Sequence, residues 1–144
     1  MADTFPSRSI TIRVDRPWRE VYEFLAIPGN FALWASGLGQ PLALEEGSWT
    51  ARTPLGKVTI AFTPRNELGI VDHQVTLPSG VVIHVPMRVV ANAQGAEVLF
   101  TLFRTPDMTD EKFAEDAAWV ERDLAALKTL LEGRRGSGAD RDEP

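Results

Sequence analysis

The sequence contains no cysteine. This absence excludes disulfides, a thiol nucleophile and a thiolate metal site. The sequence also lacks any apolar run approaching the roughly 18 residues that cross a membrane. Its opening residues, MADTFPSRS, contain neither the basic nor the apolar region of a secretory signal. These absences favour a cytoplasmic protein.

Positive charge is also scarce. Lys and Arg number 15 against 20 Asp and Glu, which gives a net charge of −5. Arg134 and Arg135 are the only adjacent cations. Nucleic acids and anionic membranes are polyanions, so an acidic chain without a basic cluster is disfavoured as their partner. We therefore expect no nucleic acid among its partners.

The sequence motifs of several enzyme classes are missing as well. There is no HExxH or other clustered ligand spacing for a metal, and iron oxygenase chemistry lacks its ligands. No serine lies in a GxSxG elbow, and no glycine loop matches GxGxxG or a phosphate-binding loop. We therefore expect no metal, no cofactor, no nucleotide and no serine hydrolase chemistry.

What is present suits one globular domain. The 144 residues are 44% hydrophobic and 24% charged, which is enough for a sizeable core. We expect a single domain over residues 1–132. Residues 133–144 are small and charged without apolar anchors, so they predict a disordered tail.

The first third of the chain predicts a strand and two short helices. Ile10, Ile12 and Val14 alternate with polar residues, as in a half-buried strand. Asp15 is expected to cap a short helix with Pro17 in its first turn. A break at residues 28–29 separates this helix from a second short helix or turn that includes Trp34 and ends near Gly37 and Gly39.

The middle of the chain predicts antiparallel strands. Alternating residues mark strands over 48–53, 58–62, 71–77 and 81–89, and a turn over 53–56 joins the first two as a hairpin. A last strand over 97–105 is apolar on both faces, so its inward face stays open.

The last ordered segment predicts one long amphipathic helix from Thr109 to Glu132, with a stop at Gly133. Its apolar residues recur every three or four positions and form one stripe: Phe113, Ala117, Val120, Leu124, Leu127 and Leu131. This stripe must lie on an apolar surface, and the strands that precede it are the natural partner. The fold class is therefore α+β, with a curved antiparallel sheet against a C-terminal helix.

This order of elements resembles the START-like, helix-grip superfamily, also called SRPBCC. The resemblance is carried by residues 10–14, by the proline and Val-aromatic pair of residues 17–22, by the segment 31–34 that ends in tryptophan, and by WVERDL at 119–124. It covers roughly residues 8–132. It implies about seven strands wrapped around the C-terminal helix, with a mostly apolar pocket between them. The superfamily includes the birch pollen allergen, lipid-transfer domains and polyketide cyclases, so it indicates a fold more than an activity.

The leading functional hypothesis is binding of a small hydrophobic or aromatic ligand, lipid-like or polyketide-like, in that cavity. Large or inward-facing residues are the expected pocket walls: Trp34, Trp49, Phe62, His73, Val85, Met87, Trp119 and Leu124. Core packing explains the tryptophans about as well.

An enzyme of the polyketide cyclase or dehydratase type is the first alternative. His73 shares the parity of the inward residues and could act as an acid or base with Asp123 or Asp116. A hydrogen-bonded core histidine and two carboxylates at the helix boundary are the plainer interpretation, with Lys112 paired to Asp116 and with Arg88 or Arg104 available to Asp123. His84 is expected on the outer face, so the two histidines form no metal site.

A protein-interaction module without a ligand is the second alternative. In that case an exposed apolar patch or a homodimer interface would be the working surface.

Overall fold

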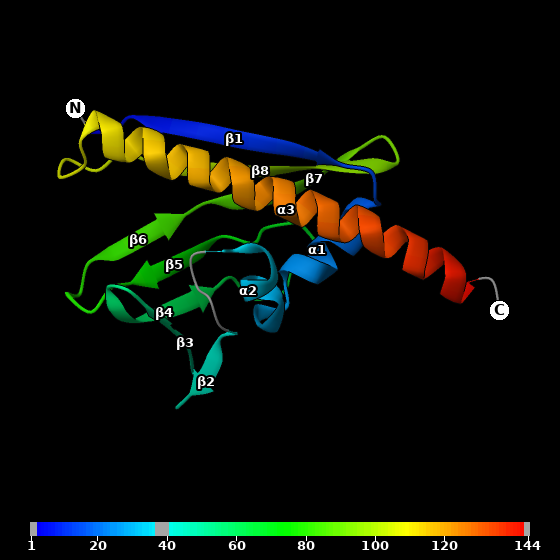
Figure 1. The fold of residues 1–144 in the computed structure, drawn as a ribbon, viewed down its shortest axis with the longest axis horizontal. Coiled ribbons are helices and arrows are strands. Elements are labelled where there is room, and N and C mark those ends of the chain that lie inside the picture. Colours follow the sequence, from blue (N-terminus) through cyan, green and yellow to red (C-terminus); the bar gives the residue numbers. More distant parts are fainter. Residues whose placement is uncertain (1–2, 37–40, 143–144) are drawn as a thin grey trace.

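The computed structural model describes residues 3–36 and 41–142, the segment 135–142 by its backbone alone. Gly37 and Gly39, where the second short helix or turn is predicted to end, lie outside these residues. Eight strands, three α-helices and one 3₁₀ turn follow one another in these residues (Figure 1). They are β1 (Ser7–Val14), α1 (Trp18–Leu25), η1 (Pro28–Asn30), α2 (Phe31–Trp34), β2 (Ala43–Glu45), β3 (Ser48–Thr53), β4 (Gly56–Phe62), β5 (His73–Thr76), β6 (Val82–Val85), β7 (Met87–Asn92), β8 (Gly95–Phe103) and α3 (Asp110–Asp142).

One half of the sheet contains β1, β8 and β7 in that order, all antiparallel. Val98 on β8 lies opposite Ile12 on β1 and Val89 on β7, and Val98 is fully buried. Because side chains alternate along a strand, Ala96 and Val98 define the inward face of β8 that the sequence left open.

The other half of the sheet runs β2-β3-β4-β5-β6. The predicted strand over 81–89 is wrong as a single strand, because it divides at Pro86 into β6 and β7. Proline has no N–H for the ladder, which breaks the pairing at that point. The chain nevertheless passes directly from one half to the other there, and the N–H of Thr101 donates to the Pro86 carbonyl at 3.0 Å. The two halves thus form one curved surface.

The side chain of Asp72 holds this junction. Its Oδ1 accepts from the Met87 N–H at 2.7 Å, and Arg88 donates to both of its carboxylate oxygens at 2.9 Å. The Arg88 guanidinium therefore lowers the pKa of Asp72, and the backbone bond acts in the same direction. A short strand of three residues, β2, extends the far edge and was not predicted, since three exposed residues carry no readable alternation.

The α1 helix begins two residues later than predicted. Pro17 occupies the N-cap position with an extended backbone, and no side chain caps the helix. Asp15 therefore does not cap it, because it lies two residues too early. The N–H of Asp15 instead donates to Glu132 on α3 at 2.8 Å, which ties the end of β1 to the long helix.

The long helix lies along β1 and also contacts α2 (Figure 1). Its predicted stripe, from Ala117 onward, belongs to the main core. Leu124, Leu127 and Leu131 are almost completely buried. Thr109 Oγ1 accepts from the Lys112 N–H at 3.0 Å and so caps the helix start. The predicted stop at Gly133 is wrong, because α3 continues to Asp142. A single glycine costs a helix only about 1 kcal/mol, too little to end it. The predicted domain limit at residue 132 and the disordered tail stay predictions.

The core has two parts. The larger lies between α3, α1 and the β1-β8-β7 half. The smaller lies on the inner face of the β2–β6 half and consists of Leu42, Ala51, Val58 and Ile60, with aromatic side chains packed against it. The N-terminal half of α3 therefore does not close down on the second half of the sheet. Within the described residues no helix has the length and hydropathy to span a bilayer.

Candidate functional site

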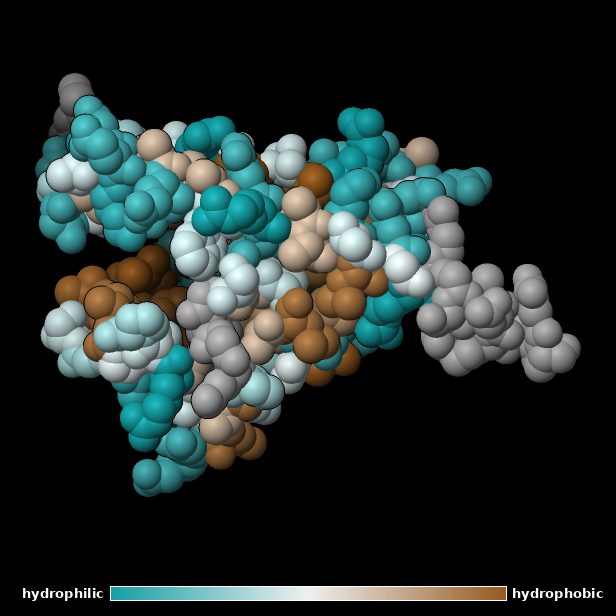
Figure 2. Space-filling model, viewed as in Figure 1, coloured by the Kyte–Doolittle hydropathy of each residue, from teal (hydrophilic) through white to brown (hydrophobic). Residues whose placement is uncertain are grey.

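An open groove of about 420 Å³ lies between the N-terminal half of α3 and the inner face of β3, β4 and β5. Figure 2 shows apolar side chains gathered in a hollow at this place, below the start of α3 and over β5 and β6. Residues from the sheet, the β3–β4 turn and the helix line it: Phe31, Thr53, Pro54, Leu55, Val58, Ile60, Val75, Leu77, Lys112, Glu115, Asp116 and Trp119. Its volume lies in the range of small-molecule sites.

Strand register builds the apolar wall of the groove. Ile60 on β4 lies directly opposite both Trp49 on β3 and Val75 on β5, so the three side chains share one face of the sheet. Val58 and Leu77 follow on the same face by alternation. These are the inward sets that the alternation of the sequence predicts.

The helix side of the groove is amphipathic. Trp119 is 44% exposed, and the Arg122 guanidinium lies over its ring at 4.9 Å. Lys112 donates to Asp116 at 2.9 Å, and this pairing raises the pKa of Lys112. Leu55, in the β3–β4 turn at the rim, is 72% exposed. The groove thus offers apolar contact area with a charged rim on one side.

A second, much smaller space lies deeper in the protein. It is a partly open compartment of about 10 Å³, lined by Leu25, Phe31, Trp34, Phe62, Val71, His73 and Met87. A space of this size holds about one water molecule. Four of the predicted wall residues meet here, since Trp34, Phe62, His73 and Met87 come from α2, β4, β5 and β7.

His73 is buried in this compartment, with 5% of its surface exposed. Its Nδ1 lies 3.2 Å from the Val71 carbonyl oxygen. Because a carbonyl only accepts, Nδ1 carries the proton of the neutral ring. Burial lowers the pKa of His73, which keeps the ring neutral near pH 7. The rings of Phe31 and Phe62 lie 5.2 and 5.9 Å from it.

The two candidate carboxylates have partners of their own. Asp123 Oδ1 accepts from the N–H and the hydroxyl of Ser36 at 3.3 and 2.6 Å. The predicted partners of Asp123 are therefore wrong, since Arg88 pairs with Asp72 and Arg104 with Asp110. Desolvation raises the pKa of Asp123, against the opposing effect of the Ser36 hydrogen bonds. Asp123 connects α3 to the end of α2.

Asp116 stands at the rim of the groove and forms the predicted helical pair with Lys112. His84 is exposed on the outer face, as predicted. In the part of the chain that the structure describes, no three His, Asp or Glu side chains are grouped so that they could hold a metal ion.

The remaining predicted wall residues lie elsewhere. Val85 is buried beside His73 across the β5–β6 ladder, and Trp49 is half-buried against the smaller core. Neither lines the groove or the compartment. Leu124 lies on the other side of α3, in an open depression of about 380 Å³ next to β1.

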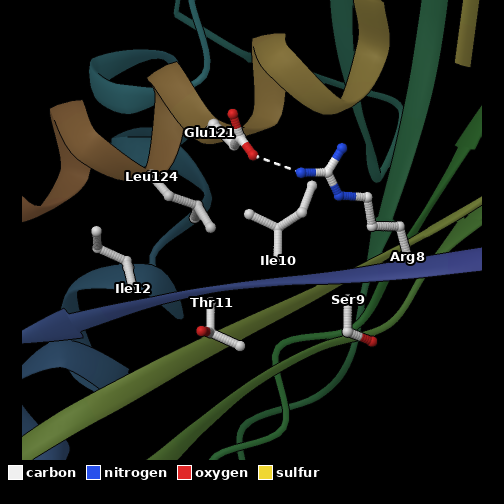
Figure 3. Close-up of a pocket in the computed structure, with 7 residues that line it drawn as sticks. All are labelled: Arg8, Ser9, Ile10, Thr11, Ile12, Glu121 and Leu124. Carbon is white, nitrogen blue, oxygen red and sulfur yellow. Dashed lines mark hydrogen bonds and ion pairs between the residues drawn. The ribbon is translucent and has the colours of Figure 1, made fainter. Parts of the chain in front are cut away.

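Figure 3 shows this depression. Ile10, Ile12 and Leu124 point toward one another between β1 and α3, and Arg8 donates to Glu121 across the opening at 2.8 Å. Ser9 and Thr11 point away from the helix. Because the two charges at its mouth neutralise each other and its floor belongs to the main core, this depression is a weaker candidate than the groove.

Phe31 is the site residue that the sequence did not reveal. It lines both the groove and the compartment, but a four-residue helix has no period from which its direction could be read. Leu55 was hidden in the same way, because a turn residue belongs to neither face of a strand.

Comparison with known proteins places the fold. No protein-family profile matches the sequence, and no curated protein does. Solved structures do match. XoxI from Bacillus cereus superposes with a TM-score of 0.68 at 12% identity over 86% of this chain and 94% of that one. Ara h 8.0201 gives a TM-score of 0.64 at 12% identity, over 89% of this chain and 98% of that one.

DynU16, a protein of the dynemicin biosynthetic locus, gives a TM-score of 0.61 at 17% identity, over 88% of this chain and 47% of that one. At these identities the likeness concerns the fold alone. The chain has the helix-grip fold that its resemblance to the START-like superfamily implied, with a curved antiparallel sheet and a long C-terminal helix.

Proposed function

We propose that this protein binds a small hydrophobic or aromatic molecule in the groove between α3 and β3–β5. The observation that carries the proposal is a space of about 420 Å³ in which Val75 and Leu77 are half-buried and Trp119 is exposed. Burying apolar surface contributes about 25 cal/mol for each Å² removed from water. A flat apolar ligand that covers Val75, Leu77 and the face of Trp119 would gain this contribution, and the charged rim would remain in water.

A thermal-shift panel of lipids, polyketides and flavonoids tests this proposal. A ligand present at about 100 times its dissociation constant adds roughly 2.7 kcal/mol of stability. For a chain of this length that corresponds to a rise in melting temperature of roughly 5–10 °C. A panel without any shift would contradict the proposal.

A matched pair of variants locates the binding. Leu77 lines the groove, whereas Leu68 is 73% exposed and lines none of the described pockets. Leu77→Glu should abolish the ligand-induced shift, because it buries a charge under the ligand. Leu68→Glu should leave the shift unchanged. Equal shifts in both variants would place the ligand outside the groove.

A cyclase or dehydratase reaction is the second candidate, and His73 is the observation that favours it. A neutral imidazole in an apolar compartment is a suitable general base. Asp123 and Asp116 are engaged with Ser36 and Lys112, so His73 would act without a close carboxylate. Replacing His73 by alanine separates the two functions, because a carrier should keep binding and an enzyme should lose turnover by about 10²–10⁴.

A further inference from the structure

Phe31 lies between the groove and the compartment. Its side chain lines both spaces. Its ring packs edge-to-face on Trp34, Phe62 and His73, with centroids 5.3, 5.6 and 5.2 Å away. Each of these edge contacts contributes about 0.5–1.5 kcal/mol, which a ligand with its own aromatic ring can replace. Among the described residues, Phe31 is the one that lines both spaces.

The compartment behind Phe31 has a defined hydrogen-bond polarity. His73 is the only residue lining it whose side chain has a nitrogen or oxygen acceptor. Because Nδ1 donates to the Val71 carbonyl, the other ring nitrogen, Nε2, bears the lone pair.

The Nε2 atom is also available to a ligand. Nε2 has no hydrogen-bond partner among the described residues. Every fully buried side-chain nitrogen or oxygen in those residues has such a partner, so Nε2 is not fully buried. Nε2 therefore keeps some accessible surface, and His73 lines the compartment. It can accept one hydrogen bond from a molecule that enters.

We propose that the compartment is a subsite for the hydroxyl end of a flat aromatic ligand, which displaces the Phe31 ring and donates a hydrogen bond to His73 Nε2. This inference rests on the proposed function, since the remainder of the ligand lies in the groove. A ketone or ether oxygen at the same place would meet the Nε2 lone pair and lose its own hydrogen bonds to water, which is costly in a buried site. The subsite thus selects donors over acceptors.

Two probes that differ in one proton test the selection. 2-Naphthol can donate to Nε2, whereas 2-methoxynaphthalene cannot. Titration calorimetry should show 2-naphthol binding to the wild-type protein about two- to tenfold more tightly, the range expected for one hydrogen bond. His73→Leu replaces the imidazole by an apolar side chain of similar size and removes the acceptor. In this variant the preference for 2-naphthol should vanish.

Phe31→Ala tests the displacement. This variant should bind both probes more tightly than the wild-type protein does, because the ring no longer has to move, and it should keep the preference for 2-naphthol. Phe5→Ala is the matched control, since Phe5 is half exposed and packs on Phe103, the last residue of β8, away from the groove and the compartment. Phe5→Ala should change neither affinity.

The outcomes separate this inference from the proposed function. If both probes bind and their affinity ratio is the same in wild type and His73→Leu, the subsite is overturned and the groove is not. If neither probe binds to wild type or to Phe31→Ala, both proposals are contradicted.

A measurement on the unmodified protein covers the case in which His73→Leu does not fold. The ¹⁵N resonance of His73 Nε2 should move on saturation with 2-naphthol and stay in place with 2-methoxynaphthalene. An unmoved resonance at saturation with 2-naphthol would overturn the subsite.

Discussion

At the scale of single residues, the buried imidazole of His73 should make the stability of the protein depend on pH. Its burial lowers its pKa below the value of about 6.5 in an unfolded chain. The unfolded state therefore takes up more protons than the folded state as the pH falls below about 6.5. The free energy of unfolding should accordingly decrease between pH 7.5 and pH 5.5.

Chemical denaturation at these two pH values measures that decrease. The charged or titratable groups nearest to His73 are Asp72 and His84, and the side chains that pack on its ring from α2, β4 and β7 are uncharged. His73→Leu should reduce the pH dependence, and His84→Gln, on the outer face, should retain it. The same slope in wild type and His73→Leu would mean that the imidazole is not buried in its neutral form.

The Ser36 hydrogen bonds of Asp123 favour a structural role over a role as acid or base. Asp123→Asn keeps an oxygen that can accept from Ser36, so ligand binding and any turnover should persist. Asp123→Ala leaves the Ser36 donors without this acceptor and should cost about 1 kcal/mol of stability. Loss of turnover in Asp123→Asn at unchanged stability would return Asp123 to the catalytic candidates.

At the scale of elements, α3 is held by its apolar stripe. Leu124 is 1% exposed, so Leu124→Ala should lower the free energy of unfolding by about 2–5 kcal/mol. Leu68→Ala, at an exposed leucine, should cost almost nothing. Urea denaturation of both variants measures the difference, and a cost for Leu124→Ala as small as that for Leu68→Ala would show that the stripe does not face the sheet.

Alanine substitutions at two glycines test the backbone conformation before Val71 and the continuation of α3 past Gly133. Gly69 has a φ of +76°, and a Cβ there would lie 2.1 Å from the Val89 carbonyl oxygen. Gly69→Ala should therefore destabilise the protein by at least about 1–3 kcal/mol. Gly133 lies in a helix with open space around it, so Gly133→Ala should raise stability by up to about 1 kcal/mol. A stabilised Gly69→Ala, or a destabilised Gly133→Ala, would contradict these assignments.

The elements differ in how well the sequence predicts them. The α3 stripe and the inward residues of β4 and β5 follow from periodicity, because each has one buried face and enough length for the pattern to repeat. The division at Pro86 and the short β2 strand do not follow, since both depend on which strands become neighbours. For the site, alternation along the strands predicts that Phe62 and His73 lie on the inner face of the sheet. The position of Phe31 could not be predicted, because it depends on how the four-residue helix α2 packs against that face.

At the scale of the whole molecule, the groove could serve either a ligand carrier or a protein-interaction module, and the oligomeric state distinguishes the two. Exposed apolar side chains at Leu55 and Trp119 line the groove, and exposed Ile83 lies opposite Val75 on the neighbouring strand. These side chains would also suit a protein partner. As a carrier, the protein should sediment as a monomer over a wide concentration range. A concentration-dependent dimer that Leu77→Glu dissociates would make the groove an interface between two copies.

The most direct test of the central claim is to map where an apolar molecule binds, by NMR titration of the protein with 2-naphthol. We expect shifts that cluster on the groove, at the methyl groups of Val58, Val75 and Leu77 and at the Trp119 indole, with little change at Ile10 and Ile12 beside the β1 depression. Saturating probe that shifts only Ile10 and Ile12, or shifts no residue, would contradict it.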